Sequence, residues 1–269
     1  MSSSQDEQSI ETGARQGWRF ERYATLGSTS DIARARALAG DAGRLWIVAD
    51  AQSAGRGRQG RVWSSPVGNL YASALLVDPC VPATAPQIGF VAGVALQRAV
   101  ADLGVEARLK WPNDLVLDGA KLAGLLVEGV IPPGRPLAAT IGIGVNIASS
   151  PEGLAYPTTS LSRAAGEPRS VWSLFERLLL RFDEALGQWA RGEGFAAIRG
   201  AWLAAAASLG GPIRVANAHG SREGLFEGLD ERGRLRLKRD GLVETIESAD
   251  ITLIPSAASA PEGAAPRGA

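Results

Sequence analysis

The stretch SAGRGRQGRVW, residues 53–63, alternates glycine with arginine shortly after an apolar run, LWIVA. Glycine lets a backbone approach a ligand closely, and successive glycine N–H groups can bind an anion. Arginine carries a fixed charge on a planar fork that matches phosphate or carboxylate. The stretch lacks the Gly-Lys-Ser/Thr ending of a P-loop, and no helical pattern follows it as in a dinucleotide-binding motif. We expect a loop that closes over an anion, with a solvated loop or an RGG-like nucleic-acid segment as alternatives.

A second candidate is KWPNDL, residues 110–115, where a lysine and a tryptophan end a predicted strand before a proline turn. Pro112 biases Trp111 toward an extended conformation. If the strand is central, Lys110 points across the sheet face and can neutralise charge that develops on a phosphate or carboxylate. The alternative is a surface lysine, with Trp111 in the core and Asn113 in an Asx turn.

The residues before the Gly/Arg stretch predict a helix at 28–40. Ser28 or Thr29 can cap this helix, and Asp31 favours its first turn. Apolar residues at helical spacing give it one face toward a core. That expected face consists of Ile32, Ala35, Leu38 and Ala39.

Three further helices are expected. Residues 86–104 keep apolar helical spacing up to a glycine, which is a common helix end. A long helix begins near Ser170, and a shorter one at 195–209 ends at Gly210-Gly211. The face of the long helix consists of Leu174, Leu178, Phe182, Leu186 and Trp189.

Short apolar runs separated by turn signals predict strands, and Asp118-Gly119 is a hairpin turn pair. The order helix–strand–helix followed by consecutive hairpins favours an α+β fold. Its mixed, largely antiparallel sheet would pack with helices, in contrast to a parallel doubly wound sheet. After Gly210, short alternating segments split by Gly and Asp turns predict a small β-barrel.

Four segments follow from these patterns. We expect a disordered lead at 1–16 and a disordered, low-complexity tail at 256–269. Between them, a main domain should occupy 17–210 and the small β-barrel 211–255.

Composition narrows the function. Lys+Arg and Asp+Glu both number 28, and a net charge of zero argues against binding of long nucleic acid over the whole surface. One cysteine excludes an internal disulfide, and one histidine excludes most His-based metal sites and makes a His-dependent triad improbable. No apolar run is long enough for a transmembrane helix, and the polar N-terminus does not resemble a signal peptide. We therefore expect a cytoplasmic protein that does not bind membranes.

Taken together and in this order, the motifs resemble the bacterial biotin–protein ligases. The resemblance is carried by GRGRQGRVWSSPVGNLYAS, KWPNDL, KLAGLLVEG and GIGVNI, with Ser28-Thr29 and Gln52 upstream. Each motif alone is common, but the combination is specific and spans nearly the whole chain between the lead and the tail. The resemblance implies a class II synthetase-like biotin–lipoate ligase domain followed by an SH3-like barrel, in a monofunctional form without an N-terminal DNA-binding domain.

This resemblance implies an activity. Such enzymes join biotin to ATP, which gives biotinyl-5′-AMP and diphosphate, and pass the biotinyl group to a lysine of a biotin carboxyl carrier domain. Magnesium is expected with ATP, although no carboxylate cluster identifies its ligands. We expect biotin, ATP and the carrier as partners, and no DNA. Dimerisation is common in the family, and the sequence does not decide it here.

The resemblance also implies residues for biotin binding at the ureido end. Ser28 and Thr29 match the family's polar motif at a helix start, and Ser30 stands where many members carry Asn. Gln52 matches a further biotin contact. The alternatives are pure N-capping for the hydroxyls and a strand-end surface position for the glutamine.

Further biotin contacts are implied for the Gly/Arg stretch and for KLAGLLVEG. Arg56, Gly57 and Arg58 fall in the ligand-binding segment, and Arg58 is expected to contact the biotin carboxylate and the phosphate. Gly124 and Leu126 would lie against the biotin ring, with an ordinary strand interior as the alternative.

The nucleotide half of the predicted site uses two cations and two polar or aromatic groups. Lys110 and Arg58 are the expected catalytic residues, with Lys110 stabilising charge at the α-phosphate and carboxylate oxygens. Trp63 is expected to stack on adenine, and Asn146 to contact it. A core aromatic and an Asx turn are the alternatives for these two. A lipoate–protein ligase is the nearest rival function, and a nucleic-acid-binding protein is a more distant one.

Overall fold

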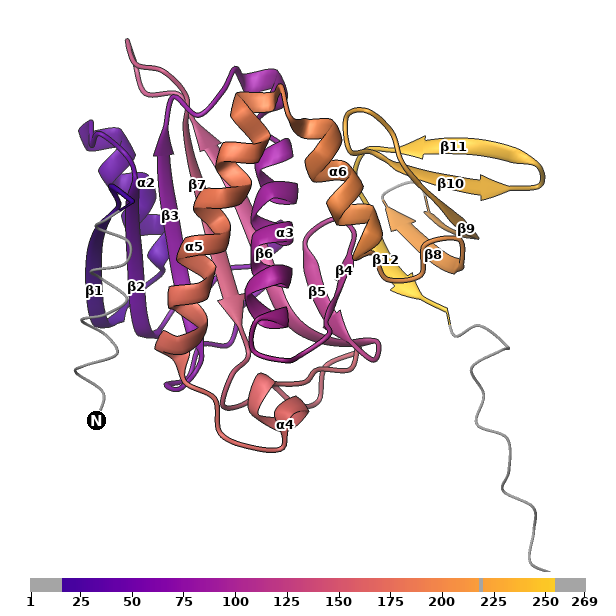
Figure 1. Cartoon of the computed structure of the whole chain (residues 1–269), viewed down its shortest axis with the longest axis horizontal. Coiled ribbons are helices and arrows are strands. Elements are labelled where there is room, and N and C mark those ends of the chain that lie inside the picture. The colour runs from indigo at the N-terminus through magenta and orange to yellow at the C-terminus, as the bar shows by residue number, and fades with distance from the viewer. Residues whose placement is uncertain (1–15, 218–219, 255–269) are drawn as a thin grey trace, which may run out of the picture. The chain divides into compact units, whose positions relative to one another are not determined.

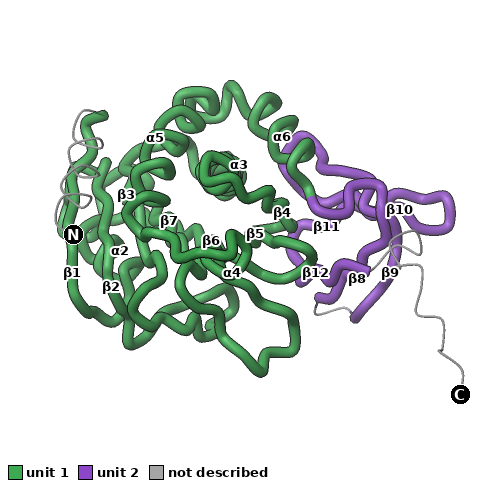
Figure 2. Tube along the Cα trace, turned by 60° about the horizontal axis from the view of Figure 1, so that its bottom comes forward, with its two compact units in different colours: residues 1–206 green, residues 207–269 purple. Residues whose placement is uncertain are grey.

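The computed structural model describes residues 16–217 and 220–254 (Figure 1). Contacts divide the chain into two compact units, Met1–Ala206 and Ala207–Ala269, which Figure 2 colours separately. Nearly all of the predicted lead, the whole predicted tail and His219 lie outside the described residues. In the described part of the chain, no helix is long and apolar enough to cross a membrane.

The first unit is built on a seven-stranded sheet of order β1-β2-β3-β7-β6-β5-β4. Only the β1–β2 pair is parallel, so the predicted mixed and largely antiparallel sheet is confirmed. At the β5–β6 turn, Asp118 and Gly119 both have positive φ, as the hairpin pair predicts. The strands are β1 (Arg19–Leu26), β2 (Leu45–Gln52), β3 (Leu70–Val77), β4 (Arg108–Lys110), β5 (Asp114–Leu117), β6 (Ala120–Val130) and β7 (Ala138–Val145).

Helices cover both faces of this sheet, α3 and α5 on one face and α2 on the other (Figure 1). Neighbouring residues of β2 point to opposite faces. Trp46 packs edge-on against Phe182 of α5, whereas Ile47 joins a buried cluster with Ala33 and Ala37 of α2. The helices are α2 (Thr29–Ala39), α3 (Gln87–Ala101), α4 (Leu161–Ala165), α5 (Val171–Trp189) and α6 (Phe195–Ala204), with 3-10 turns η1 (Arg58–Gly60), η2 (Pro82–Thr84) and η3 (Ala190–Gly192).

The predicted apolar face of α2 is largely wrong. Ile32 packs partly against the core, but Leu38 is 50% exposed, and the two other residues of that face, Ala35 and Ala39, are exposed too. The helix instead turns its smallest side chains to the sheet, with Thr29, Ser30, Ala33 and Ala37 buried. Small residues occupy the buried face because the helix lies very close to the strands. A Cβ on Gly142 would lie 2.6 Å from the Ser30 hydroxyl oxygen.

The predicted end of the last helix is also wrong. Helix α6 ends at Ala204, well before Gly210, although the intervening residues are good helix formers. The chain leaves the helix because the Ala205 carbonyl accepts the Leu109 N–H (2.8 Å) and Ala206 forms a parallel bridge with Leu109. Pairing with the edge strand β4 therefore overrides local helix propensity.

The second unit is a five-stranded antiparallel sheet of order β11-β10-β9-β8-β12. This confirms the predicted small C-terminal β domain. The final alternating segment, 242–254, forms two strands. The five strands are β8 (Pro212–Asn217), β9 (Gly220–Leu229), β10 (Leu235–Arg239), β11 (Leu242–Ile246) and β12 (Asp250–Leu253).

Candidate functional site

Antiparallel pairing aligns three of the sequence motifs in one row across the sheet. Lys110 pairs with Asp114, Asp114 with Gly124, and Gly124 with Gly144. Directly paired residues share a face of the sheet. The row therefore presents a lysine and a carboxylate beside two positions without side chains, on the face that also carries α2.

Two lysines hold one buried carboxylate at the end of this row. Asp114 is 9% exposed, and its oxygens lie 2.9 Å from Lys110 Nζ and 2.7 Å from Lys121 Nζ. Burial disfavours the charged carboxylate, yet the charges of Lys121 and Lys110 hold the pKa of Asp114 below its ordinary value. The three groups form a charged cluster with one excess positive charge, which suits an anionic ligand.

The indole of Trp63 lies on the glycine part of the row. A Cβ on Gly144 would lie 2.6 Å from this ring, and one on Gly124 would lie 3.0 Å from it. Lys121 Nζ is 5.4 Å from the ring centroid and 5.6 Å from that of Tyr156, so the ammonium lies near two aromatic faces. The two glycines make this close approach sterically available, because any larger residue would displace the indole.

The Gly/Arg stretch folds as a tight hairpin. Arg56 forms an antiparallel bridge with Val62, and the Gly57 N–H donates to the Arg61 carbonyl (2.7 Å). At its base the Trp63 N–H donates to the Gly55 carbonyl (2.9 Å), and a Cβ on Gly55 would lie 2.4 Å from the Trp63 carbonyl oxygen. Gly55 thus allows the close approach of the two hairpin arms at their base.

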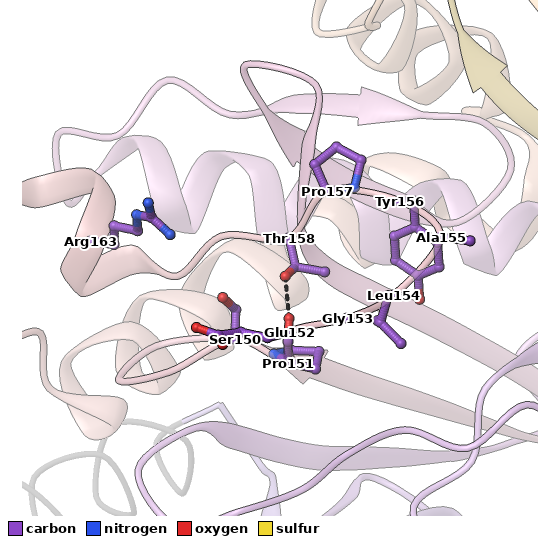
Figure 3. A pocket seen from close by; sticks show the side chains of 10 residues that line it. All are labelled: Ser150, Pro151, Glu152, Gly153, Leu154, Ala155, Tyr156, Pro157, Thr158 and Arg163. Atoms are coloured by element: carbon purple, nitrogen blue, oxygen red, sulfur yellow. Dashed lines mark hydrogen bonds between the residues drawn. The ribbon is translucent and has the colours of Figure 1, made fainter.

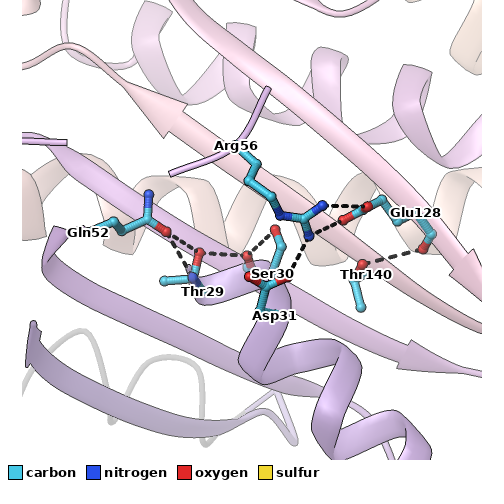
Figure 4. Close-up of polar contacts among 8 residues, drawn as sticks. Thr29, Ser30, Asp31, Gln52, Arg56, Glu128 and Thr140 are labelled. Atoms are coloured by element: carbon cyan, nitrogen blue, oxygen red, sulfur yellow. Dashed lines mark hydrogen bonds and ion pairs between the residues drawn. The ribbon is translucent and has the colours of Figure 1, made fainter. Parts of the chain in front are cut away.

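Arg56 fixes this hairpin to two other elements (Figure 4). Its guanidinium makes a two-pronged contact with Glu128 of β6, at 3.0 and 2.9 Å. It also contacts Asp31 in the first turn of α2, at 2.7 Å. In the described structure the Arg56 head group therefore joins the loop to the sheet and to the helix.

Arg58 lies on the side of the KWPNDL turn. Its Nη1 donates to Asn113 Oδ1 at 3.2 Å. Asn113 is itself bound to β6. Its side-chain amide donates to the Leu125 carbonyl (2.6 Å), and its backbone carbonyl accepts the Leu125 N–H (2.8 Å). Leu126, the next residue, lies on the α2 face directly opposite Gly142.

The polar residues at the start of α2 gather around Gln52 (Figure 4). Gln52 Oε1 accepts from the Thr29 backbone N–H (2.8 Å) and from its hydroxyl (3.1 Å). Ser73 of β3, fully buried, contacts the hydroxyls of Thr29 (2.8 Å) and Ser30 (3.1 Å). Ser28 occupies the N-cap position without a side-chain cap bond. None of these hydroxyls therefore serves as the helix cap.

Asn146 lies just beyond β7 and connects two other backbone segments. It is 3% exposed, and its amide donates to the carbonyls of Thr159 (3.1 Å) and Lys121 (3.5 Å). The loop that follows lines a pocket of about 460 Å³. Figure 3 shows the residues around it, with Thr158 donating to the Pro151 carbonyl. The pocket lining consists of Ser150, Pro151, Glu152, Gly153, Leu154, Ala155, Tyr156, Pro157, Thr158 and Arg163.

Sequence reasoning missed four side chains that the structure brings into this site: Asp114, Lys121, Glu128 and Ser73. All four lie within the quoted motifs, but adjacency in sequence did not show which neighbours would share a face with Lys110. Strand alternation supplies such a signal, because Gly124, Leu126 and Glu128 recur with a period of two. Ser73 gave no signal of this kind, because its importance depends on contacts with α2.

Family models match both units of the chain. The model described as "Biotin/lipoate A/B protein ligase family" matches residues 28–146, and that described as "Biotin protein ligase C terminal domain" matches residues 208–253. Among solved structures, the biotin protein ligase from Aquifex aeolicus in complex with biotin and ATP is similar, with a TM-score of 0.77 and 25% identity. That match covers 88% of this chain and 99% of the Aquifex chain.

Two curated relatives of this chain are both ligases. The biotin–[acetyl-CoA-carboxylase] ligase of Paracoccus denitrificans is 38% identical over 223 residues, which is 79% of this chain and 91% of that protein. The bifunctional ligase/repressor BirA of Bacillus subtilis (strain 168) is 34% identical over 213 residues, 77% of this chain and 65% of that protein. The chain belongs to the biotin protein ligase family of enzymes.

Proposed function

We propose that this enzyme activates biotin with ATP and transfers the biotinyl group to a lysine of a biotin carboxyl carrier domain. In the first step a biotin carboxylate oxygen attacks the α-phosphorus, a P–O bond forms, and diphosphate leaves. In the second step the carrier lysine amine attacks the acyl carbon, an amide forms, AMP leaves and the amine releases a proton. Membership of the family and the relatives named above support the ligase chemistry.

The observation that carries the proposal for this site is the row of Lys110, Asp114 and the paired glycines. A carboxylate and an α-phosphate repel one another, so their reaction needs fixed positive charge aimed at both. Lys110 and Lys121 supply two such charges, and Asp114 fixes where each ammonium lies. Arg58, anchored near Asn113, supplies a third cation from the loop.

Biotin would lie between the start of α2 and the part of the sheet at Gly124 and Gly144, where the strands carry no side chains. We assign its ureido ring to Ser28, Thr29, Ser30 and Gln52; the side chains of the last three belong to one hydrogen-bonded group. We assign its ring and chain to the surface at Gly124 and Leu126, where the Trp63 indole now lies against Gly124 and would move aside for the ligand. Gly57 and the backbone around Arg56 would border the carboxylate. The Arg56 side chain serves the hairpin through its ion pairs.

The nucleotide part of the adenylate would lie on the side of Trp63 away from the biotin ring. We propose that the indole, which lies against Gly124 and Gly144, moves to cover the bound intermediate and keeps water from its mixed anhydride. Asn146 holds two backbone segments near Lys121, and its side-chain oxygen is our candidate adenine contact. Both assignments extend the family resemblance to the positions in this chain.

Magnesium fits the reaction better as an ion carried by ATP than as a resident of the protein. Among the described residues no group of three His, Cys, Asp or Glu side chains could hold a metal. Asp114, the carboxylate of the row, is already bound by two lysines. We propose that Mg²⁺ is held mainly by the phosphates and water, that the carrier is the macromolecular partner, and that the enzyme acts in the cytoplasm.

The decisive experiment combines Mg-ATP, a biotin carrier domain and either biotin or lipoate, with measurement of diphosphate release and carrier labelling. We expect labelling with biotin only, and its loss in Arg58→Ala. Labelling with lipoate alone would overturn the substrate, whereas turnover with neither acid would overturn the function.

A further inference from the structure

Five side chains form an unbroken series of hydrogen bonds from α2 to the Gly/Arg hairpin. The series runs from Ser30 to Ser73 (3.1 Å), to Thr29 (2.8 Å), and to Gln52 (3.1 Å). Gln52 Nε2 then contacts Ser65 (3.0 Å), whose hydroxyl donates to the Trp63 carbonyl (3.0 Å). Figure 4 shows the part of the series around Thr29, Ser30 and Gln52.

Two backbone groups, the Thr29 N–H and the Trp63 carbonyl, determine the direction of every bond in this series. The Thr29 backbone N–H, 2.8 Å from Gln52, can only donate, so the side-chain atom that faces it must be the carbonyl oxygen. The Gln52 amide nitrogen therefore faces Ser65 and donates to it. At the other end, the Trp63 carbonyl can only accept, so the single Ser65 proton is committed to it.

The same logic fixes the three hydroxyls at the start of α2. Thr29 donates to the Gln52 carbonyl oxygen, so it can only accept from Ser73. The single Ser73 proton is then used, and Ser30 must donate to Ser73. The hydroxyl protons of Thr29 and Ser30 are thus both donated to other groups of the protein. Each hydroxyl can therefore only accept a hydrogen bond from a ligand.

We infer that Ser73 is a positioning residue for substrate specificity: by taking the Ser30 proton and giving its own to Thr29, it presents both hydroxyls to the ligand as acceptors. This inference rests on the proposed function, which assigns those hydroxyls to biotin. The group that fits them must donate hydrogen bonds, as the two ring N–H groups of a cyclic urea do.

The inference also predicts selection against the rival substrate. A dithiolane ring, as in lipoate, has no N–H group, so it would leave the Ser30 lone pairs and the second lone pair of Thr29 without donors. Unpaired buried polar groups lower affinity strongly. Ser73 is 0% exposed, and its register partner Gly142 has no side chain, so the Ser30 hydroxyl can reach it.

The test measures binding of biotin, of biotin methylated on one ureido nitrogen, and of lipoate by titration calorimetry. The variants are Ser73→Ala and Gly142→Ala, whose added Cβ would lie 2.6 Å from the Ser30 oxygen. The matched control is Ser170→Ala, which loses one hydrogen bond at the cap of α5. We expect Ser73→Ala to raise the biotin Kd about tenfold, with a smaller change for the methylated ligand.

Steady-state kinetics separates a positioning role from a general structural one. The KM for biotin should rise in Ser73→Ala and in Gly142→Ala, while kcat and the KM for ATP stay close to those of Ser170→Ala. An unchanged biotin Kd in a folded Ser73→Ala protein, or an equal loss for every ligand, would overturn the inference. A wild-type enzyme that does not bind biotin would instead overturn the proposed function.

Discussion

Asp114 shows how a single buried charge can organise a site. A carboxylate that is 9% exposed would be costly without partners, and here two ammonium groups lie within 2.9 Å of it. Because its pKa is held below the ordinary value of 3.8, it stabilises the folded state above that pH and loses this effect as the pH falls further. The same contacts fix both ammonium groups beside the row.

At this scale we predict that Lys110→Gln lowers the rate of biotinyl-adenylate formation by a factor of about 10²–10³, because one preorganised positive charge is lost. Single-turnover measurement of diphosphate release checks this. The matched control is Lys238→Gln, an exposed lysine of the second unit. A folded Lys110→Gln enzyme with the wild-type rate would remove Lys110 from the chemistry.

At the scale of elements, the hairpin at 55–63 depends on partners outside itself. Arg56 connects it to β6 through Glu128 and to α2 through Asp31. These side chains are between 29% and 55% exposed, so the ion pairs are screened by solvent and salt. Such contacts hold a loop in place and still let it reopen, which a step of ligand entry and product release requires.

We therefore predict that Glu128→Gln loosens the hairpin without unfolding the sheet. Hydrogen exchange at the amides of residues 55–63 should quicken about two- to fivefold, as expected for a partly exposed ion pair worth about 0.5–1 kcal/mol. High salt should reduce the difference from wild type. Glu223→Gln removes an exposed pair with Arg214 and serves as the control. Equal exchange in wild type and Glu128→Gln would show that the pair does not restrain the loop.

At the scale of the whole first unit, the row extends beyond the site to Tyr71, which pairs with Gly144. The Tyr71 hydroxyl donates to the Pro66 carbonyl (2.8 Å) and so ties the segment after the hairpin to β3. Burial of the phenol raises the pKa of Tyr71 to about 12. The sheet, the loop and the protonation of this side chain are therefore coupled.

This coupling predicts an alkaline loss of stability. A phenol whose pKa is near 10 when unfolded and about 12 when folded contributes fully below pH 10. Its contribution, roughly 2–3 kcal/mol, is lost between pH 10 and 12. Urea unfolding of wild type and Tyr71→Phe from pH 8 to 11 measures it. The two slopes against pH should differ above pH 10, and parallel slopes would contradict the coupling.

The sequence by itself determined the α+β class, the largely antiparallel sheet and the C-terminal β domain, and it indicated the segments that carry the candidate site. These depend on local causes, namely alternation in strands, the Asp118-Gly119 turn and the Ser170 cap, which the structure confirms. The buried face of α2 and the end of α6 needed the tertiary structure, because close packing and pairing with β4 overrode local preference.

Tertiary structure also decided which residues of the motifs act together. Lys110 and Lys121 meet on Asp114 only because three strands align in register. The Arg56 side chain, which the sequence predicts at biotin, contacts two carboxylates that the sequence did not indicate. Ser73 matters because a helix approaches a strand that is distant in sequence. The sequence shows the types of these residues and their spacing along a strand. Which hydrogen-bond and ion-pair partners each residue has is decided by the folded sheet.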